Sequence, residues 1–131
     1  MFAAIAADLA DAEQAGDVAG LVAPLTEALG HLQGSTMWLA QNGMANPNHA
    51  GAGSYAYMQL MGLVSLGWMW LKMAGVAQKL LAEGSEETAF LEAKLTTARF
   101  FAARELVTAG ALRRKVEAGA QSVMELPVEA F

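Results

Sequence analysis

The chain has 131 residues, of which 55% are hydrophobic, with three prolines, no cysteine and a formal net charge of −5. This alanine-rich composition with few β-branched runs favours an all-α protein, and the length predicts a single domain over residues 1–131. The lack of cysteine excludes disulfides, thiolate metal sites and cysteine nucleophiles. The acidic balance argues against binding to nucleic acid or an anionic membrane.

The first forty residues predict two helices. Apolar residues recur at helical spacing at Phe2, Ile5, Ala6 and Leu9. Gly16 closes this short first helix, and Asp17 is the expected cap of the next one, whose apolar period runs from Val18 to Leu39. Pro24 would cost about 3 kcal/mol in a helix interior, so either the helix kinks there or Pro24 lies in the first turn of a restarted helix. The N-terminus lacks a basic segment before a long apolar core, which does not match a signal peptide, so we expect a cytoplasmic protein.

The most apolar stretch runs from Ala50 to Leu71 without a formal charge, after a break at Asn46-Pro47-Asn48 where Asn48 or a neighbour caps the helix. Apolar side chains point in every direction along it, so this helix is either the centre of a bundle or a membrane span. Its glycines favour the bundle, because they allow another helix to approach closely; they are Gly51, Gly53, Gly62 and Gly67.

Four methionines form a stripe along one side of this helix: Met58, Met61, Met69 and Met73. Filling of the core is the favoured interpretation, because methionine adapts to irregular gaps. The alternative is an adaptable contact surface for a partner or ligand. Trp68 and Trp70 stand two residues apart and cannot share a face, so at least one leans toward a neighbouring element or subunit.

A last long helix begins near Ser85, where a hydroxyl cap is followed by two acids. Its apolar stripe consists of Leu91, Leu95, Ala98, Ala102, Leu106, Ala109, Leu112 and Val116. Gly119 ends it, and the remaining residues form an extended tail whose terminal Phe131 is expected to dock on the bundle. The predicted fold is an up-down helical bundle of three long helices, with a short N-terminal helix and an extended C-terminal tail.

Residues able to do chemistry are sparse. His31 and His49 are the only histidines, and Glu27 is the only acid at helical ligand spacing from either. Metal-binding bundles need more carboxylate and histidine ligands than this, so we expect no metal site. No phosphate-binding glycine loop or nucleophile motif occurs, and the acids near Glu83 read as a solvated turn. Arg99 and Arg104 lie among Phe100 and Phe101, a combination that could hold a phosphate but is more typical of ion pairs at a bundle edge.

Two blocks are more specific than these patterns: YMQLMGLVSLGWMWLKMA from Tyr57 to Ala74, and AKLTTARFFAARELV from Ala93 to Val107, followed by AGAQSVMELP. Together they resemble the C-terminal extension of bacterial acyl-CoA dehydrogenases, in the branch that includes 3-methylmercaptopropionyl-CoA dehydrogenase. The resemblance covers about the last three-fifths of the chain. The matching positions are Tyr57, Leu60, Gly62, Gly67, Trp68, Lys94, Ala98, Arg99, Phe100, Phe101, Gly119, Ala120 and Ser122.

This resemblance implies a helical module appended to the catalytic body of a flavoprotein of fatty acid metabolism, an oxidoreductase that uses FAD to desaturate an acyl-CoA thioester. The catalytic glutamate belongs to that body, so we expect no catalytic, FAD-binding or metal-binding residue in this chain alone. We expect the chain to be a fragment or a free-standing copy that packs against an acyl-CoA dehydrogenase body or forms a homo-oligomer. Candidates for the interface or the substrate edge are Tyr57, Trp68, Lys94 and Arg99.

Two other interpretations of the sequence remain. The first is a membrane-embedded protein, which the apolar stretch from Ala50 to Leu71 supports. The sequence contains no second membrane span for it, because the preceding helix carries Glu27, His31 and Pro24. A free-standing bundle that binds an apolar or acyl ligand would use a pocket lined by methionine and tryptophan. Solubility without detergent separates the first from the packing module, and saturable quenching of tryptophan fluorescence by an apolar ligand would favour the second.

Overall fold

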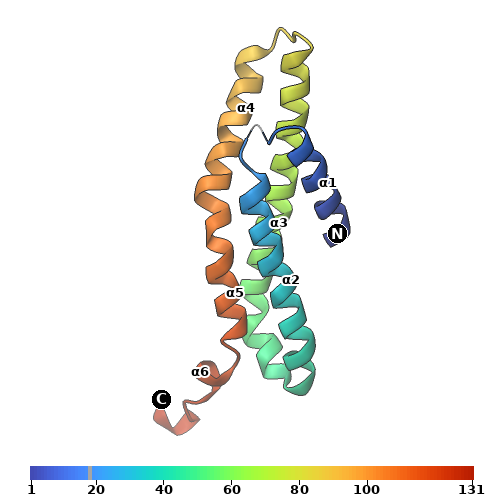
Figure 1. Cartoon of the computed structure of the whole chain (residues 1–131). Coiled ribbons are helices and arrows are strands. Elements are labelled where there is room, and N and C mark those ends of the chain that lie inside the picture. Colours follow the sequence, from blue (N-terminus) through green and yellow to red (C-terminus); the bar gives the residue numbers. More distant parts are fainter. Residues whose placement is uncertain (18) are drawn as a thin grey trace.

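The computed structural model describes residues 1–17 and 19–131, and within these residues it contains helices and no strand. Three long rods lie side by side (Figure 1): α2 (Val22–Ala45), α3 (Pro47–Ala82), and a third rod in which α4 (Thr88–Phe100) continues into α5 (Ala109–Glu117). The short helix α1 (Phe2–Gln14) packs on α2 and α3 through the buried Ile5 and Leu9. The predicted all-α bundle of three long helices and a short first helix is therefore confirmed.

The starts of α2 and α3 follow the capping signals in the sequence. The Asp17 carboxylate accepts hydrogen bonds from the backbone N–H groups of Leu21 at 2.8 Å and Val22 at 3.2 Å, which satisfies donors that have no partner inside the helix. Pro24 lies in the first turn of α2, so the restart was the correct alternative. Val18, where the period was expected to begin, lies outside the described residues.

Helix α3 is longer than the uncharged stretch that predicted it. The Asn46 side chain accepts a hydrogen bond from the Asn48 N–H at 3.0 Å, so the neighbour of Asn48 is the cap. Only one stripe of α3 is buried: Gly53, Ala56, Leu60, Val64, Gly67, Leu71, Ala74 and Ala77. A Cβ on Gly67 would stand 2.9 Å from Leu25 Cδ1, which confirms the close packing predicted for this glycine. The same prediction was wrong for Gly51 and Gly62, where nothing lies within 4 Å of the Cβ position.

The third rod is not a uniform α-helix. Between α4 and α5 it passes through a π-helical turn, η1 (Phe101–Glu105), and a 3-10 turn, η2 (Leu106–Thr108). The apolar stripe takes two successive four-residue steps here, from Ala98 to Ala102 and on to Leu106, and all three residues are buried. The wider π turn takes up the extra residue and keeps the stripe pointing at the core.

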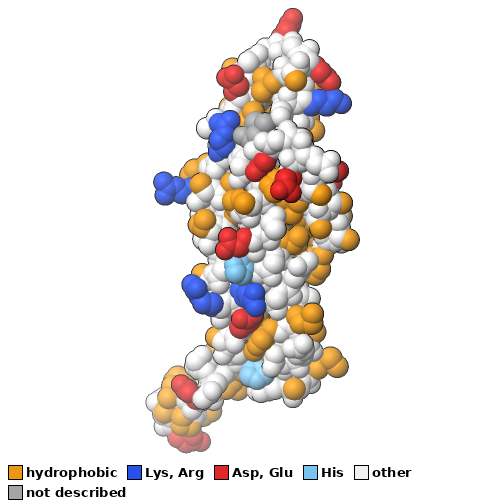
Figure 2. Space-filling model, in the orientation of Figure 1, with side chains coloured by type: hydrophobic (Ala, Val, Ile, Leu, Met, Phe, Trp, Pro, Cys, Tyr) orange, Lys and Arg blue, Asp and Glu red, His pale blue; other side chains and the backbone are white. Residues whose placement is uncertain are grey.

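The C-terminal tail leaves the bundle. After Gly119, which has a φ of +69°, come a short helix α6 (Gln121–Met124) and a 3-10 turn η3 (Val128–Ala130). The tail projects past the end of the rods (Figure 1), and Figure 2 shows hydrophobic side chains gathered on it. Phe131 is 92% exposed, so the expectation that it docks on the bundle was wrong. Ala120 is still buried against the bundle, and the chain after it runs off the end of the rods with its apolar residues exposed.

Candidate interaction surface on the third helix

The four methionines of α3 lie on the outside of the bundle. Their exposed fractions run from 37% for Met61 and Met73 to 59% for Met58, so the favoured interpretation of these residues as core was wrong. The reason is geometric: α2 and the α4–α5 rod both pack on the stripe of small and aliphatic residues around Leu60 and Gly67. The opposite side of α3 is left without a helix against it among the described residues.

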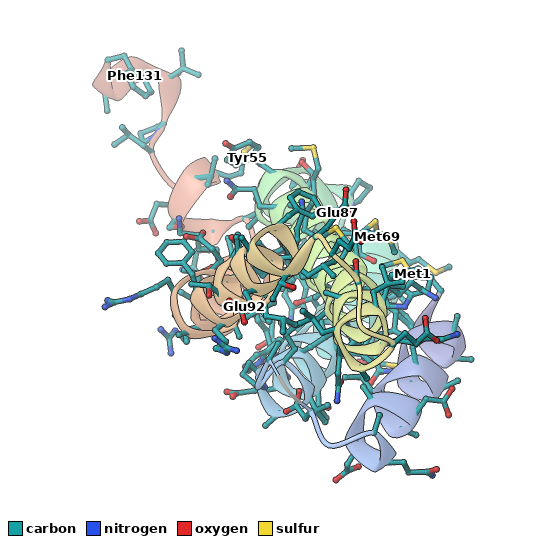
Figure 3. All side chains as sticks on the ribbon, turned by 90° about the horizontal axis from the view of Figure 1, so that it is seen from above. Met1, Tyr55, Met69, Glu87, Glu92 and Phe131 are labelled. Atoms are coloured by element: carbon teal, nitrogen blue, oxygen red, sulfur yellow. The ribbon has the colours of Figure 1, made fainter. Side chains whose placement is uncertain are left out.

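We call this side the outer α3 face. It consists of Tyr55, Met58, Leu66, Met69, Met73, Val76 and Leu80, all exposed, with Met61 at its edge. These residues follow one another in steps of three and four, and Gly62 occupies the one gap in the series. Such a repeat is the pattern of a coiled-coil seam. Figure 3 shows Tyr55 and Met69 pointing outward from α3, and Phe131 well away from the bundle.

The face is long and almost free of charge. From Tyr55 to Leu80 it runs about 37 Å at 1.5 Å per residue. The nearby Lys72 does not interrupt it with a free charge, because its ammonium lies 2.7 Å from the Asp8 carboxylate on α1. Figure 2 shows charged side chains on α1, along α5, around the turn between α3 and α4 and on the tail.

An apolar groove extends the face toward α4. It has a volume of about 330 Å³ and is lined chiefly by Met73, Val76, Leu80 and Phe90, with lysines at its rim. Phe90 is 58% exposed. The lysine of α4 at this rim, Lys94, lies over the rings of Phe90 and Trp70 at 5.2 and 5.7 Å from their centres. The groove therefore pairs an apolar floor with a cation held in place by two aromatic rings.

The four residues proposed from the sequence lie in separate places. The Tyr57 hydroxyl lies 2.9 Å from Thr36 Oγ1, between α3 and α2, and Trp68 Nε1 donates to Asp8 Oδ2 at 2.6 Å. Lys94 stands at the rim of the groove, and Arg99 is exposed on α4. Trp68 leans toward α1 while Trp70 packs near Phe101, which confirms that the two tryptophans serve different neighbours.

The contact between α1 and α3 is electrostatic as well as apolar. The hydrogen bond from Lys72, followed by that from the Trp68 indole, holds the pKa of the Asp8 carboxyl below its ordinary value. Both donors stabilise the ionised carboxylate. This cluster ties α1 to the middle of α3.

A second, polar groove lies between α2 and α5, next to the 3-10 turn η2. It has a volume of about 480 Å³ and is lined by His31, Arg113, Arg114 and Glu117 among others. Arg113 Nε donates to Glu117 Oε1 at 2.7 Å, and the Arg113 guanidinium stands 2.7 Å from the position of a Cβ on Gly34. Because Arg113 and Glu117 already pair with each other, the groove attracts a charged ligand less strongly than its number of charged residues indicates.

The structure also bears on whether the chain has a metal site or a membrane-spanning helix. Within residues 1–17 and 19–131, no three histidine or carboxylate side chains come together in a way that could hold a metal ion. Helix α3 is long and apolar enough to span a membrane by length and composition, and 33% of its most apolar window is buried in the bundle. One such helix is weak evidence for a membrane protein, because the core helix of a soluble bundle passes the same test.

Comparison with known proteins identifies the module. The sequence model of a family described as "Acetyl-CoA dehydrogenase C-terminal like" matches residues 1–127. The chain belongs to this family. It is also 32% identical over 117 residues to the broad-specificity linear acyl-CoA dehydrogenase FadE5 of Mycobacterium tuberculosis. These aligned residues make up 88% of this chain and 18% of that relative. The chain thus spans less than a fifth of the relative's length.

Family membership extends the resemblance that the sequence blocks carried. The match includes α1 and α2 as well as the last three-fifths of the chain. The outer α3 face entered the sequence analysis only as the alternative interpretation of its methionines, although a stronger signal for it exists. Two seams with steps of three and four run along α3, one rich in alanine and glycine at Gly53 to Ala77 and one rich in methionine and leucine at Tyr55 to Leu80.

Proposed function

We propose that this chain is a non-catalytic structural and assembly module of an acyl-CoA dehydrogenase, and that it works by packing its outer α3 face against a protein surface. The single observation that carries this is the exposed seam from Tyr55 to Leu80 on a chain of this family. Its seven side chains are 37 to 66% exposed and form one continuous row along the helix. Exposed apolar patches of this extent mark interaction sites.

The parent reaction we assign is the FAD-dependent α,β-desaturation of an acyl-CoA thioester in the cytoplasm, with the flavin held by the catalytic body. Family membership and the name of the mycobacterial relative support this class. The described residues fit a flavin poorly, because the grooves around α3 and α5 are open, and the charged one is occupied by its own Arg113–Glu117 pair. The contribution of this chain is accordingly mechanical: it buries apolar surface and holds subunits together.

The test is a segment exchange in the mycobacterial relative. Its matching segment is replaced by this chain, and the mass and flavin content of the enzyme are measured beside a deletion that lacks the segment. We expect the exchanged enzyme to keep its number of subunits and its flavin. The deletion should form an oligomer with fewer subunits. Leu66→Asp in the exchanged segment should mimic the deletion, while Thr97→Asp, at an exposed position of α4, should not. A deletion with an unchanged number of subunits, flavin content and stability would refute the assembly role.

The isolated chain gives a complementary test. Mixed with FAD and a panel of acyl-CoA thioesters, it should show neither bound flavin absorbance nor bleaching. Flavin that binds and bleaches would mean that the chain carries chemistry of its own.

A second candidate function is supported by the groove between α3 and α4. Its apolar floor suits an acyl chain, and Lys94 is the rim cation for an anionic head, because Lys72 is paired with Asp8. Glu87 also lines the groove, and Trp70 lies next to Lys94. Methionine lines this groove through Met73, whereas its described lining contains no tryptophan. Saturable quenching of tryptophan fluorescence by a long-chain fatty acid, lost in Val76→Asp but kept in Thr97→Asp, would support ligand binding.

A further inference from the structure

We propose that the outer α3 face is occupied by the same face of a second copy of this chain, with the two α3 helices antiparallel and a two-fold axis at the level between Leu66 and Met69. This inference rests on the proposed packing function and names its partner. The face is an unpartnered coiled-coil seam within the described structure, and such a seam is completed by another helix carrying the same spacing.

The seam is complementary to itself when one copy is reversed. With Leu66 opposite Met69, the regular spacing brings Gly62 opposite Met73 and Tyr55 opposite Leu80. Gly62 is exposed, and nothing lies within 4 Å of where its Cβ would stand, so the long Met73 side chain of the partner has room there. A symmetric dimer needs this property, because each pair of contacts occurs twice in an isologous interface.

The ends of the seam favour the antiparallel over the parallel arrangement. The turn after α3 carries Glu83, Glu86 and Glu87. Reversal of one copy brings this acidic turn beside the N-terminal end of the other α3, where the helix dipole gives a partial positive charge. A parallel pair would instead place the two acidic turns side by side, where like charges repel.

The same charges argue against a lipid bilayer as the occupant. Surface-binding helices flank their apolar face with Lys and Arg to attract anionic lipids. The outer α3 face ends in glutamates, Lys72 beside it is paired with Asp8, Lys79 lies 3.9 Å from Glu83, and the chain has a net charge of −5. A protein surface with the same seam fits these features better than a membrane.

Site-directed crosslinking tests the arrangement, and the natural absence of cysteine makes it clean. Tyr55→Cys and Leu80→Cys chains, distinguished by a tag, are treated with a short bis-maleimide alone and as a mixture. We expect a crosslinked dimer in the mixture and in neither variant alone, because the two copies of position 55 lie about 37 Å apart in the antiparallel pair. Mixed Gln33→Cys and Thr97→Cys chains, both exposed on other helices, provide the matched control and should stay uncrosslinked.

Solution mass provides the second arm. The wild-type chain at micromolar concentration should have the mass of a dimer, and Leu66→Asp should halve it with the helical circular dichroism unchanged, because Leu66 is outside the core. Crosslinking of Tyr55→Cys alone would overturn the antiparallel pairing. A monomeric wild-type chain, or binding to phosphatidylglycerol vesicles that Leu66→Asp abolishes, would overturn the second copy as occupant.

These results separate the inference from the function on which it rests. If the isolated chain is monomeric but Leu66→Asp still disrupts the exchanged mycobacterial enzyme, the face packs on a catalytic body; the proposed function then stands and the self-pairing falls. If neither measurement responds to Leu66→Asp, both fall.

Discussion

A pair of glycine substitutions on α3 tests the packing of the bundle. Gly67 is buried, and a Cβ there would lie 2.9 Å from Leu25 Cδ1 and 3.0 Å from Leu106 Cδ2. Gly75 is exposed on the same helix, and nothing lies within 4 Å of its Cβ position. Alanine gains about 1 kcal/mol in helix propensity at either position. Only at Gly67 does the new methyl group meet buried leucines, and such overpacking costs about 1–3 kcal/mol.

We therefore expect Gly75→Ala to stabilise the chain and Gly67→Ala to be about 1–3 kcal/mol less stable than Gly75→Ala. The assay is urea unfolding followed by circular dichroism, with all variants at one low protein concentration, because association itself would add apparent stability. The slopes of the transitions should agree between the variants. Equal free energies of unfolding for the two variants would refute the close approach of α2 and η2 to Gly67.

Three further predictions concern α3 and its partners. Asp8→Asn should destabilise the chain at neutral pH, because the folded pKa of Asp8 is lowered and its ionised carboxylate stabilises the fold. The difference in free energy of unfolding between wild type and Asp8→Asn should persist above the ordinary aspartate range and vanish as pH falls well below about 4. Urea unfolding at several pH values measures this difference. Tyr57→Phe should cost about 1 kcal/mol in urea unfolding, since it removes the hydrogen bond to α2, and no loss would contradict that bond. Leu60→Ala should cost about 2–5 kcal/mol through a core cavity. The exposed Leu66→Ala should cost less than about 0.5 kcal/mol at low protein concentration, and similar losses in both variants would contradict the assignment of inner and outer faces.

Sequence predicted those parts of the fold that have a local chemical signal. Asn46 caps α3 as a side-chain oxygen at a helix start should, and the Asp17 carboxylate accepts from the first N–H groups of α2, although Leu21 is the N-cap residue there. The apolar stripe of the last rod was visible because charged residues separate its members, and seven of its eight positions are buried, with Leu112 half-buried. Where polar and apolar residues alternate at the helical period, the sequence pattern predicts which face of the helix is buried.

The outer α3 face was only the alternative interpretation of the methionine stripe, because that contrast between polar and apolar sides is missing on α3. From Tyr55 to Leu71 no charge marks the solvent side, so periodicity alone cannot distinguish Met69, which is outside, from Leu71, which is inside. The tail failed for a different reason: Phe131 is apolar, but apolarity does not say whether a docking surface lies within its reach. The four residues proposed as an edge remain a proposal, and the structure places two of them, Tyr57 and Trp68, in bonds between helices.

The central claim is that this module works through one apolar helix face. Its most direct test is the oligomeric mass of the mycobacterial dehydrogenase that carries this chain in place of its own segment, measured with and without Leu66→Asp. We predict full mass for the unmodified exchange and for the Thr97→Asp control, and a loss of mass with Leu66→Asp. Full mass in all three proteins would contradict the claim, because the outer α3 face would then contribute nothing to assembly.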